Sequence, residues 1–161
     1  MKLKSWIFEG IRWIAAAAMI VCLVMLFGGD PVSSAEFADV SAAVVPEVDT
    51  ANTQEAESQM IKRLYGLDPV EFEGCTLYYP LTNMDAEELL IIKLKDVSQQ
   101  EKVKAAIEAR LDAQKTAFDG YGVGQMDLLT NYCVVEVRGN FVLFVVSKTC
   151  EAAKTAFLGA L

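Results

Sequence analysis

The side chains that could bind a ligand fall in three short stretches of the sequence. The candidates are Tyr78, Tyr79, Asn83, Glu87, Glu88, Arg110, Gln114 and Arg138. Tyrosine offers an aromatic face with a hydroxyl group, and asparagine and glutamine each offer an amide. Arginine offers a planar fork of N–H donors that matches a carboxylate. Side chains of these types, gathered in one place, would form a recognition surface, so ligand binding is the chemistry that they favour.

The acidic residues in this set suggest two further kinds of chemistry. Asp85, Glu87 and Glu88 follow Asn83 and could supply oxygen ligands to a hard cation such as calcium. The EF-hand spacing is absent, however, and a solvated loop between two strands is the favoured interpretation. Paired carboxylates could also hydrolyse a glycan, but among 22 acidic residues some lie close together by chance. We therefore predict no metal ligand, no cofactor and no catalytic residue, and we keep a carboxylate-based hydrolase as an alternative.

Gln114 is the polar residue whose position is most informative. It lies four residues before Phe118 and seven after Ile107, on the apolar stripe of a predicted helix, and Arg110 borders the same stripe one turn earlier. A glutamine there is either hydrogen-bonded within the fold or lines a small polar pocket. Structural hydrogen bonding is the favoured interpretation.

The remaining candidates lie at strand ends. Tyr78 and Tyr79 precede Pro80, and Arg138 stands beside the Gly139-Asn140 pair. Tyrosines in such places more often pack through the ring and keep the hydroxyl group in water. A recognition surface is the alternative for these three residues.

Histidine is absent from the sequence, which excludes several enzyme classes. Ser-His and Cys-His nucleophilic catalysis and histidine-containing zinc sites all need an imidazole. The net charge is −8, and no basic stripe is present. A nucleic acid is therefore excluded as a partner, because its phosphates need clustered lysine and arginine.

Four cysteines are present at positions without metal-binding or redox spacing, namely Cys22, Cys75, Cys133 and Cys150. Cys75 and Cys133 both fall in predicted strands, so a bridge between them is geometrically allowed. Buried thiols that act as small hydrophobic groups are the favoured interpretation. The pairing of the cysteines stays open at this stage.

Residues 1–29 form a basic start followed by an uncharged apolar run, which favours a membrane-directed segment. Residues 6–29 are long enough for a retained single-pass anchor, the favoured interpretation. The alternative is a signal peptide that is cleaved near Ala35, with secretion of the rest. Basic residues precede the run and acidic residues follow it, so the positive-inside rule places the C-terminal part outside the cell membrane in both cases.

After the apolar segment, residues 30–58 indicate a stalk or a loosely packed helix, and residues 59–161 indicate an α+β domain. We expect four strands and two helices that follow them, at Cys75–Tyr79, Glu88–Lys95, a helix capped by Ser98, Cys133–Arg138, Phe141–Val146 and a helix from Thr149. A further helix ends near Tyr65. The order predicts a four-stranded antiparallel sheet in a helix-ββα-ββα arrangement, preceded by one hydrophobic helix.

One face of this sheet carries more apolar residues than a solvent-exposed face tolerates, namely Leu89, Ile91, Val134, Leu143 and Val145. Either the helices of residues 36–65 or another molecule must cover it. The helices are the favoured cover. The register follows if Arg138 pairs with Phe141 around a two-residue turn.

Several blocks of sequence together resemble domain-of-unknown-function family 4358. They are 62–68 (KRLYGLD), 77–80 (LYYP), 83–94 (NMDAEELLIIKL), 109–115 (ARLDAQK) with Tyr121-Gly122, and 136–140 (EVRGN). The resemblance spans about residues 36–161 and implies a small exported or membrane-attached bacterial protein, often a lipoprotein. This chain departs from the lipoprotein members, because the residues before Cys22 lack the small side chain of a lipidation site. The family has no established activity, so the resemblance implies location and extent only.

Taken together, these features predict a membrane-tethered extracytoplasmic module that is not an enzyme. Its partners would be the membrane, through residues 6–29, and an envelope protein or a second copy of the chain. The alternatives are a carboxylate-based envelope hydrolase and a protein that binds a solute or a cation.

Overall fold

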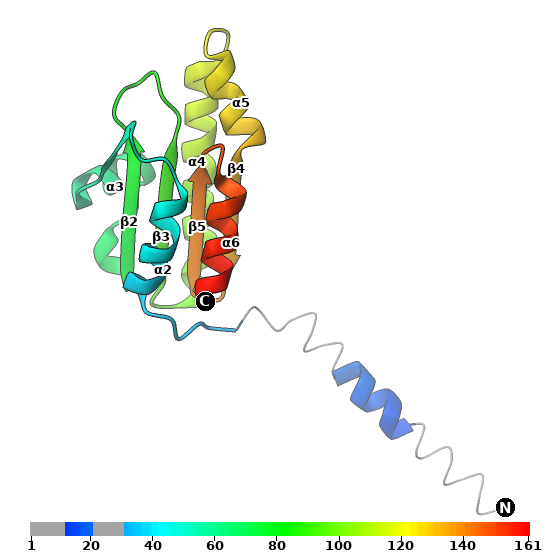
Figure 1. Cartoon of the computed structure of the whole chain (residues 1–161). Helices are drawn as coiled ribbons and strands as arrows, with labels where there is room; N and C mark the ends of the chain where they lie inside the picture. The colour runs from blue at the N-terminus through cyan, green and yellow to red at the C-terminus, as the bar shows by residue number, and fades with distance from the viewer. Residues whose placement is uncertain (1–11, 21–30) are drawn as a thin grey trace, which may run out of the picture. The chain divides into compact units, whose positions relative to one another are not determined.

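The computed structural model describes residues 12–20 and 31–161 of the chain (Figure 1). Residues 12–20 form a helix in a first unit, and Val32–Leu161 form a second, compact unit. Among the helices in the described ranges, none is both long and apolar enough to cross a bilayer. The predicted membrane segment spans residues 6–29. Its residues 6–11 and 21–29 lie outside the described residues.

The compact unit is an α+β fold built on a five-stranded antiparallel sheet in the order β1-β2-β3-β5-β4. The strands are β1 Thr53–Glu55, β2 Gly74–Pro80, β3 Glu88–Lys93, β4 Cys133–Arg138 and β5 Phe141–Val146. The prediction of four strands is therefore wrong by one. β1 was missed because its Thr-Gln-Glu sequence has no apolar alternation, and only pairing with β2, from Thr53 to Pro80, makes it a strand.

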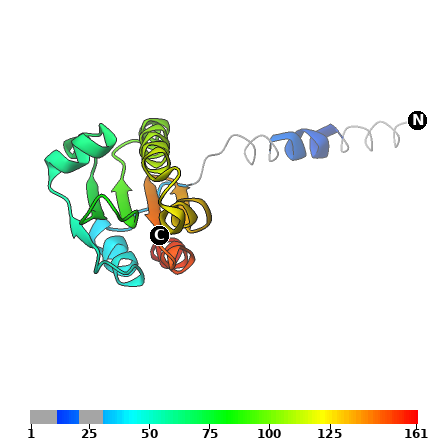
Figure 2. The ribbon, with the colours of Figure 1, turned by 90° about the horizontal axis from the view of Figure 1, so that it is seen from above.

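Helices cover both faces of the sheet, as Figure 2 shows. The first face carries α3 Ser58–Tyr65, α4 Gln100–Phe118 and α5 Val123–Asn131, and the second carries α2 Phe37–Val44 and α6 Cys150–Ala160. Three short 3₁₀ helices complete the unit, η1 Val45–Glu47, η2 Pro69–Glu71 and η3 Val97–Gln99. The central strands β3 and β5 are buried at all of their positions, because helices pack against both sides of them.

The first face holds the larger hydrophobic core. Leu90 and Ile92 of β3 point to this face, and Val103 and Ile107 of α4 pack over it. All four side chains have no exposed surface. This packing fixes α4 against the start of β3, where the candidate site lies.

The second, highly apolar face is covered by helices of the same chain. Leu89, Ile91 and Val145 are fully buried beneath Val40 and Val44 of α2 and Phe157 of α6. Of the two predicted covers, the structure shows the chain's own helices. The cover comes only in part from residues 36–65, however, because α3 lies on the first face and α6 provides the other half. Within the segment 30–58, α2 is therefore packed against the sheet.

The hairpin of β4 and β5 confirms the predicted register. Arg138 pairs with Phe141, and the pairing continues to Cys133 and Val146. Gly139 in the turn has a φ of 53°, a left-handed conformation that glycine adopts without strain.

The start of the long helix differs from the prediction that Ser98 caps it. Asp96 is the capping residue: its side chain accepts a hydrogen bond of 2.8 Å from the backbone N–H of Ser98. The Gln99 side chain accepts in return from the backbone N–H of Asp96, which completes a capping box. The long helix α4 is therefore preceded by η3, and Asp96 caps the start of η3 by accepting from the backbone N–H of Ser98.

The described cysteines are all free thiols, so Cys75 and Cys133 form no bridge. Burial raises the pKa of the Cys75 thiol to about 12, and burial also raises the pKa of Cys133, to about 11. These values suppress the reactive thiolate at neutral pH. Cys22 lies outside the described residues.

Candidate functional site

A fully buried carboxylate, Glu88, organises the site at the first residue of β3. Alternation along the strand points it to the same face as Leu90, toward α3 and α4. Its side chain accepts hydrogen bonds from Tyr65 Oη at 2.6 Å, from Arg110 Nη2 at 2.8 Å and from Gln114 Nε2 at 2.8 Å. Arg110 Nε adds two contacts of 3.1 and 3.2 Å. A buried carboxylate is tolerated when it is paired and hydrogen-bonded in this way.

The charges of this cluster stabilise one another. Burial alone would lower the pKa of the Arg110 guanidinium, but the hydrogen bond to Glu88 and its negative charge outweigh that effect and raise the pKa. Burial and the charge of Glu88 raise the pKa of Tyr65 well above its ordinary value. Tyr65 therefore stays protonated and donates, and Arg110 stays charged.

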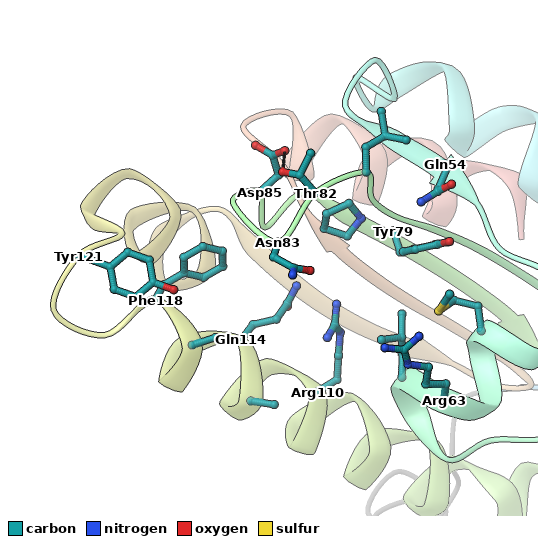
Figure 3. Close-up of a pocket in the computed structure, with 16 residues that line it drawn as sticks. Gln54, Arg63, Tyr79, Thr82, Asn83, Asp85, Arg110, Gln114, Phe118 and Tyr121 are labelled. Atoms are coloured by element: carbon teal, nitrogen blue, oxygen red, sulfur yellow. Dashed lines mark hydrogen bonds between the residues drawn. The ribbon is translucent and has the colours of Figure 1, made fainter.

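A cavity of about 530 Å³ opens next to this cluster, between α3, α4 and the loop that follows β2. We call it the α4 cleft, and its polar lining consists mainly of Arg63, Tyr79, Asn83, Asp85, Arg110 and Gln114. Figure 3 shows Arg110 and Gln114 reaching from α4 toward the loop that carries Asn83 and Asp85. Phe118 and Tyr121 add aromatic surface at one end.

Several polar groups of the cleft are not used within the fold. The side chain of Arg63 makes no hydrogen bond or ion pair with any other residue that the structure describes. Arg110 donates to Glu88 through Nε and Nη2, so its Nη1 remains available to a ligand. Gln114 Oε1 is a buried oxygen without a hydrogen-bond partner among the described residues. The cleft thus offers cationic donors and a neutral acceptor to a bound molecule.

Acidic groups are few in the cleft. Asp85 is the only carboxylate among the described side chains that line it, and its Oδ2 accepts a 2.7 Å hydrogen bond from Thr82. Glu88 lies beneath the lining and is fully enclosed by its partners. The predicted start of a strand at Glu88 is confirmed, but the interpretation of its side chain as a solvated acid is wrong, because residues of α3 and α4 enclose it. No group of three or more Cys, Asp or Glu side chains in the described ranges could hold a metal ion.

The structure brings five of the eight candidate residues together. Tyr79, Asn83, Arg110 and Gln114 line the α4 cleft, and Glu88 holds two of them from below. For Gln114, both interpretations apply: it is hydrogen-bonded within the fold, and it lines a polar pocket.

The other three candidates lie elsewhere. Tyr78 points to the second face of the sheet, where it packs beside the core under α2 and α6. Glu87 is not part of the cleft lining. Arg138 lies at the opposite end of the sheet from Glu88 and forms a 2.9 Å ion pair with Glu136.

Sequence reasoning missed Arg63 and Tyr65, which α3 brings to the site. Tyr65 lies on the apolar face of that helix, where its role as a donor to a buried acid has no local signal. Arg63 is a helix residue that looks like any solvated charge. Only the packing of α3 beside α4 places the two residues at the cleft, so no pattern within the sequence could have found them.

Comparison with known proteins identifies one family. A family model with the description Domain of unknown function (DUF4358) matches residues 46–147, which include every residue of the α4 cleft. Neither the curated proteins nor the solved structures contain a significant match to the chain. The model covers more than half of the sequence, and the chain therefore belongs to the family of domains of unknown function DUF4358.

Proposed function

We propose that this protein is a membrane-tethered extracytoplasmic module, not an enzyme, that binds a component of the cell envelope in the α4 cleft. One observation carries the proposal: the cleft presents unused hydrogen-bonding groups on side chains held in place from below. Arg110 and Gln114 are both fixed by the buried Glu88, so their free atoms keep a set position. Binding sites need this support, because a held side chain loses little conformational entropy when the ligand arrives.

The alternatives receive less support from the same geometry. A carboxylate hydrolase needs two acids that face each other across the substrate, and Asp85 stands alone among the described lining residues. Self-association was motivated by the apolar face of the sheet, which α2 and α6 cover. A ligand in the cleft therefore explains more of the described features than either alternative.

The proposed location rests on the N-terminal sequence. Residues 13–29 carry no charge and are mainly apolar, basic residues precede them and acidic residues follow them, which favours an outward-facing domain. We expect protease added to intact, wall-stripped cells to digest the C-terminal domain and to leave a cytoplasmic marker protein whole. Immunoblotting with an antibody to the domain measures the result. Survival of the domain until the cells are lysed would place it inside and end this proposal.

The proposed use of the cleft can be tested before the ligand is known. A photo-activated benzophenone side chain at Leu81, which lines the cleft and is half-exposed, should give a covalent adduct in intact cells. The same group at Val70, which is more exposed but lies outside the cleft, should give none. Gel shift and mass spectrometry of the full chain measure the adduct.

Two charge variants make this test specific. Arg63→Gln should abolish the adduct at position 81, because it removes the unpaired cation of the cleft. Lys62→Gln removes the same charge one residue away, where the side chain pairs with Asp68 on the surface, and should leave the adduct unchanged. Equal labelling at positions 70 and 81, or an adduct insensitive to Arg63→Gln, contradicts binding in the cleft.

A further inference from the structure

We infer that the ligand of the α4 cleft is of the peptide class and is held by a terminal carboxylate and the backbone N–H next to it. This inference rests on the proposed function, since it names the ligand of the same cleft. It follows from the two kinds of group that the cleft leaves unused, guanidinium donors and an amide oxygen, and from the size of the cleft.

The guanidinium groups select an anion. Arg63 has no partner among the described residues, and Arg110 keeps Nη1 free after it binds Glu88. The fork of an arginine fits both carboxylate and phosphate. Asp85 lies in the same lining and carries a negative charge of its own. Charge does not separate the two anions, because the two arginines attract a doubly charged phosphate more strongly and Asp85 repels it more strongly. The carboxylate is favoured because in a peptide an N–H donor lies next to it, and the unpartnered oxygen of Gln114 needs such a donor.

The amide of Gln114 requires a donor. Its orientation is set, because Nε2 must donate to the charged Glu88 and Oε1 must then point away. The glutamine is only 5% exposed, and Oε1 has no hydrogen-bond partner. Leaving a buried acceptor without a partner is unfavourable. Gln114 lines the cleft, so a ligand seated against the α4 wall can supply the missing donor, and a backbone N–H is a donor of the right kind.

The size and rim of the cleft agree with one or two residues of a peptide. A volume of about 530 Å³ is typical of small-ligand pockets. Phe118 and Tyr121 offer apolar surface for a side chain. Leu81 and Tyr121 are more than half exposed at the mouth, where the remainder of a longer peptide can leave. A terminal carboxylate can pair with the arginines, and the N–H before it can donate to Gln114 Oε1. A group of this size also fits the volume of the cleft.

The test uses probes that differ by one group each, titrated into the full chain in detergent by calorimetry. Acetyl-Ala-Ala, in its L,L and D,D forms, carries both groups. Acetyl-Ala-Ala-amide lacks the carboxylate charge, acetyl-Ala-lactate replaces the last N–H with an ester oxygen, and inorganic phosphate carries charge alone. We expect one form of acetyl-Ala-Ala to bind about tenfold or more tightly than each of the other three, because each lacks a contact worth about that factor.

Variants assign the contacts. Arg63→Gln should weaken acetyl-Ala-Ala about tenfold and leave the amide unchanged, whereas Lys62→Gln should change neither. Gln114→Met should remove the preference for acetyl-Ala-Ala over acetyl-Ala-lactate, with thermal melting as the check that the variant folds. If that variant does not fold, the relative affinity of the unaltered chain for acetyl-Ala-Ala and acetyl-Ala-lactate still tests whether the N–H is bound.

Three results would overturn the inference: equal binding of acetyl-Ala-Ala and acetyl-Ala-lactate, tightest binding of phosphate, or no binding of any probe. They leave the proposed function standing if the photo-adduct at Leu81 still depends on Arg63. Loss of that adduct as well would refute the proposed function itself. The two failures are therefore distinguishable.

Discussion

Replacing Glu88 with leucine is expected to lower the free energy of unfolding by about 3 kcal/mol, or roughly 10 °C in melting temperature. Leucine fills a similar volume, so the loss comes from the groups around it. The Arg110 guanidinium, whose side chain is only 17% exposed, would lose its carboxylate partner. Tyr65 Oη and Gln114 Nε2 would lose their acceptor at the same time. Urea unfolding followed by circular dichroism measures the change.

The neighbouring acid and the paired charge supply the controls. Glu87→Gln removes a charge one residue earlier, outside the cluster, and should shift stability by less than about 0.5 kcal/mol. The double variant Glu88→Leu, Arg110→Met should be more stable than Glu88→Leu alone, because the unpaired buried cation is gone. If the Glu88→Leu variant unfolded at the same urea concentration as the unaltered chain, the cluster would not hold α3 and α4 in place.

Replacing Val40 with aspartate is expected to be at least as disruptive, and to make the protein associate. Val40 has no exposed surface and packs in α2 over the second face of the sheet. A carboxylate there has no partner, which costs about 3 kcal/mol or more. Release of α2 would expose Leu89, Ile91 and Val145, an apolar surface that favours contact with a second copy. Sedimentation velocity measures association, and thermal melting measures stability.

Ala42→Asp is the matched control, because it puts the same carboxylate on the exposed side of the same helix. It should remain monomeric and should melt within a few degrees of the unaltered chain. If Val40→Asp behaved in the same way, the apolar face would not depend on α2 for its cover. Self-association through that face would then return as a candidate function.

The parts of the fold that local patterns predict are those where one chain segment carries the whole signal. β4 and β5 are runs of six residues rich in valine and phenylalanine on either side of Gly139-Asn140, and their register follows from the turn. β1 carries no such signal, because three polar residues become a strand only by pairing with β2. The cap of α4 was displaced by two residues, since Asp96 and Ser98 are both good capping residues and geometry chose the first.

For the site, helical spacing was sufficient to place Gln114 on an apolar stripe and Arg110 one turn earlier at the border of that stripe. It was not sufficient to predict that Glu88 lies under them, because an acid at the start of a strand is usually solvated. Arg63 and Tyr65 come from a helix that packs beside α4 on the same face. The pairing of those helices depends on tertiary packing, so no spacing within either one reveals it.

The sequence by itself determined the α+β class, the membership of the family and the face to which the residues of β3, β4 and β5 point. These properties follow from alternation and from blocks of residues that are local in the chain. Only the tertiary structure decided that α2 and α6 share the cover of the second face, and that Glu88 holds Arg110 and Gln114 beneath an open cleft. The physical reason is that a periodic pattern sets which side of an element is apolar. Which distant element buries that side depends on how the whole chain fills its core.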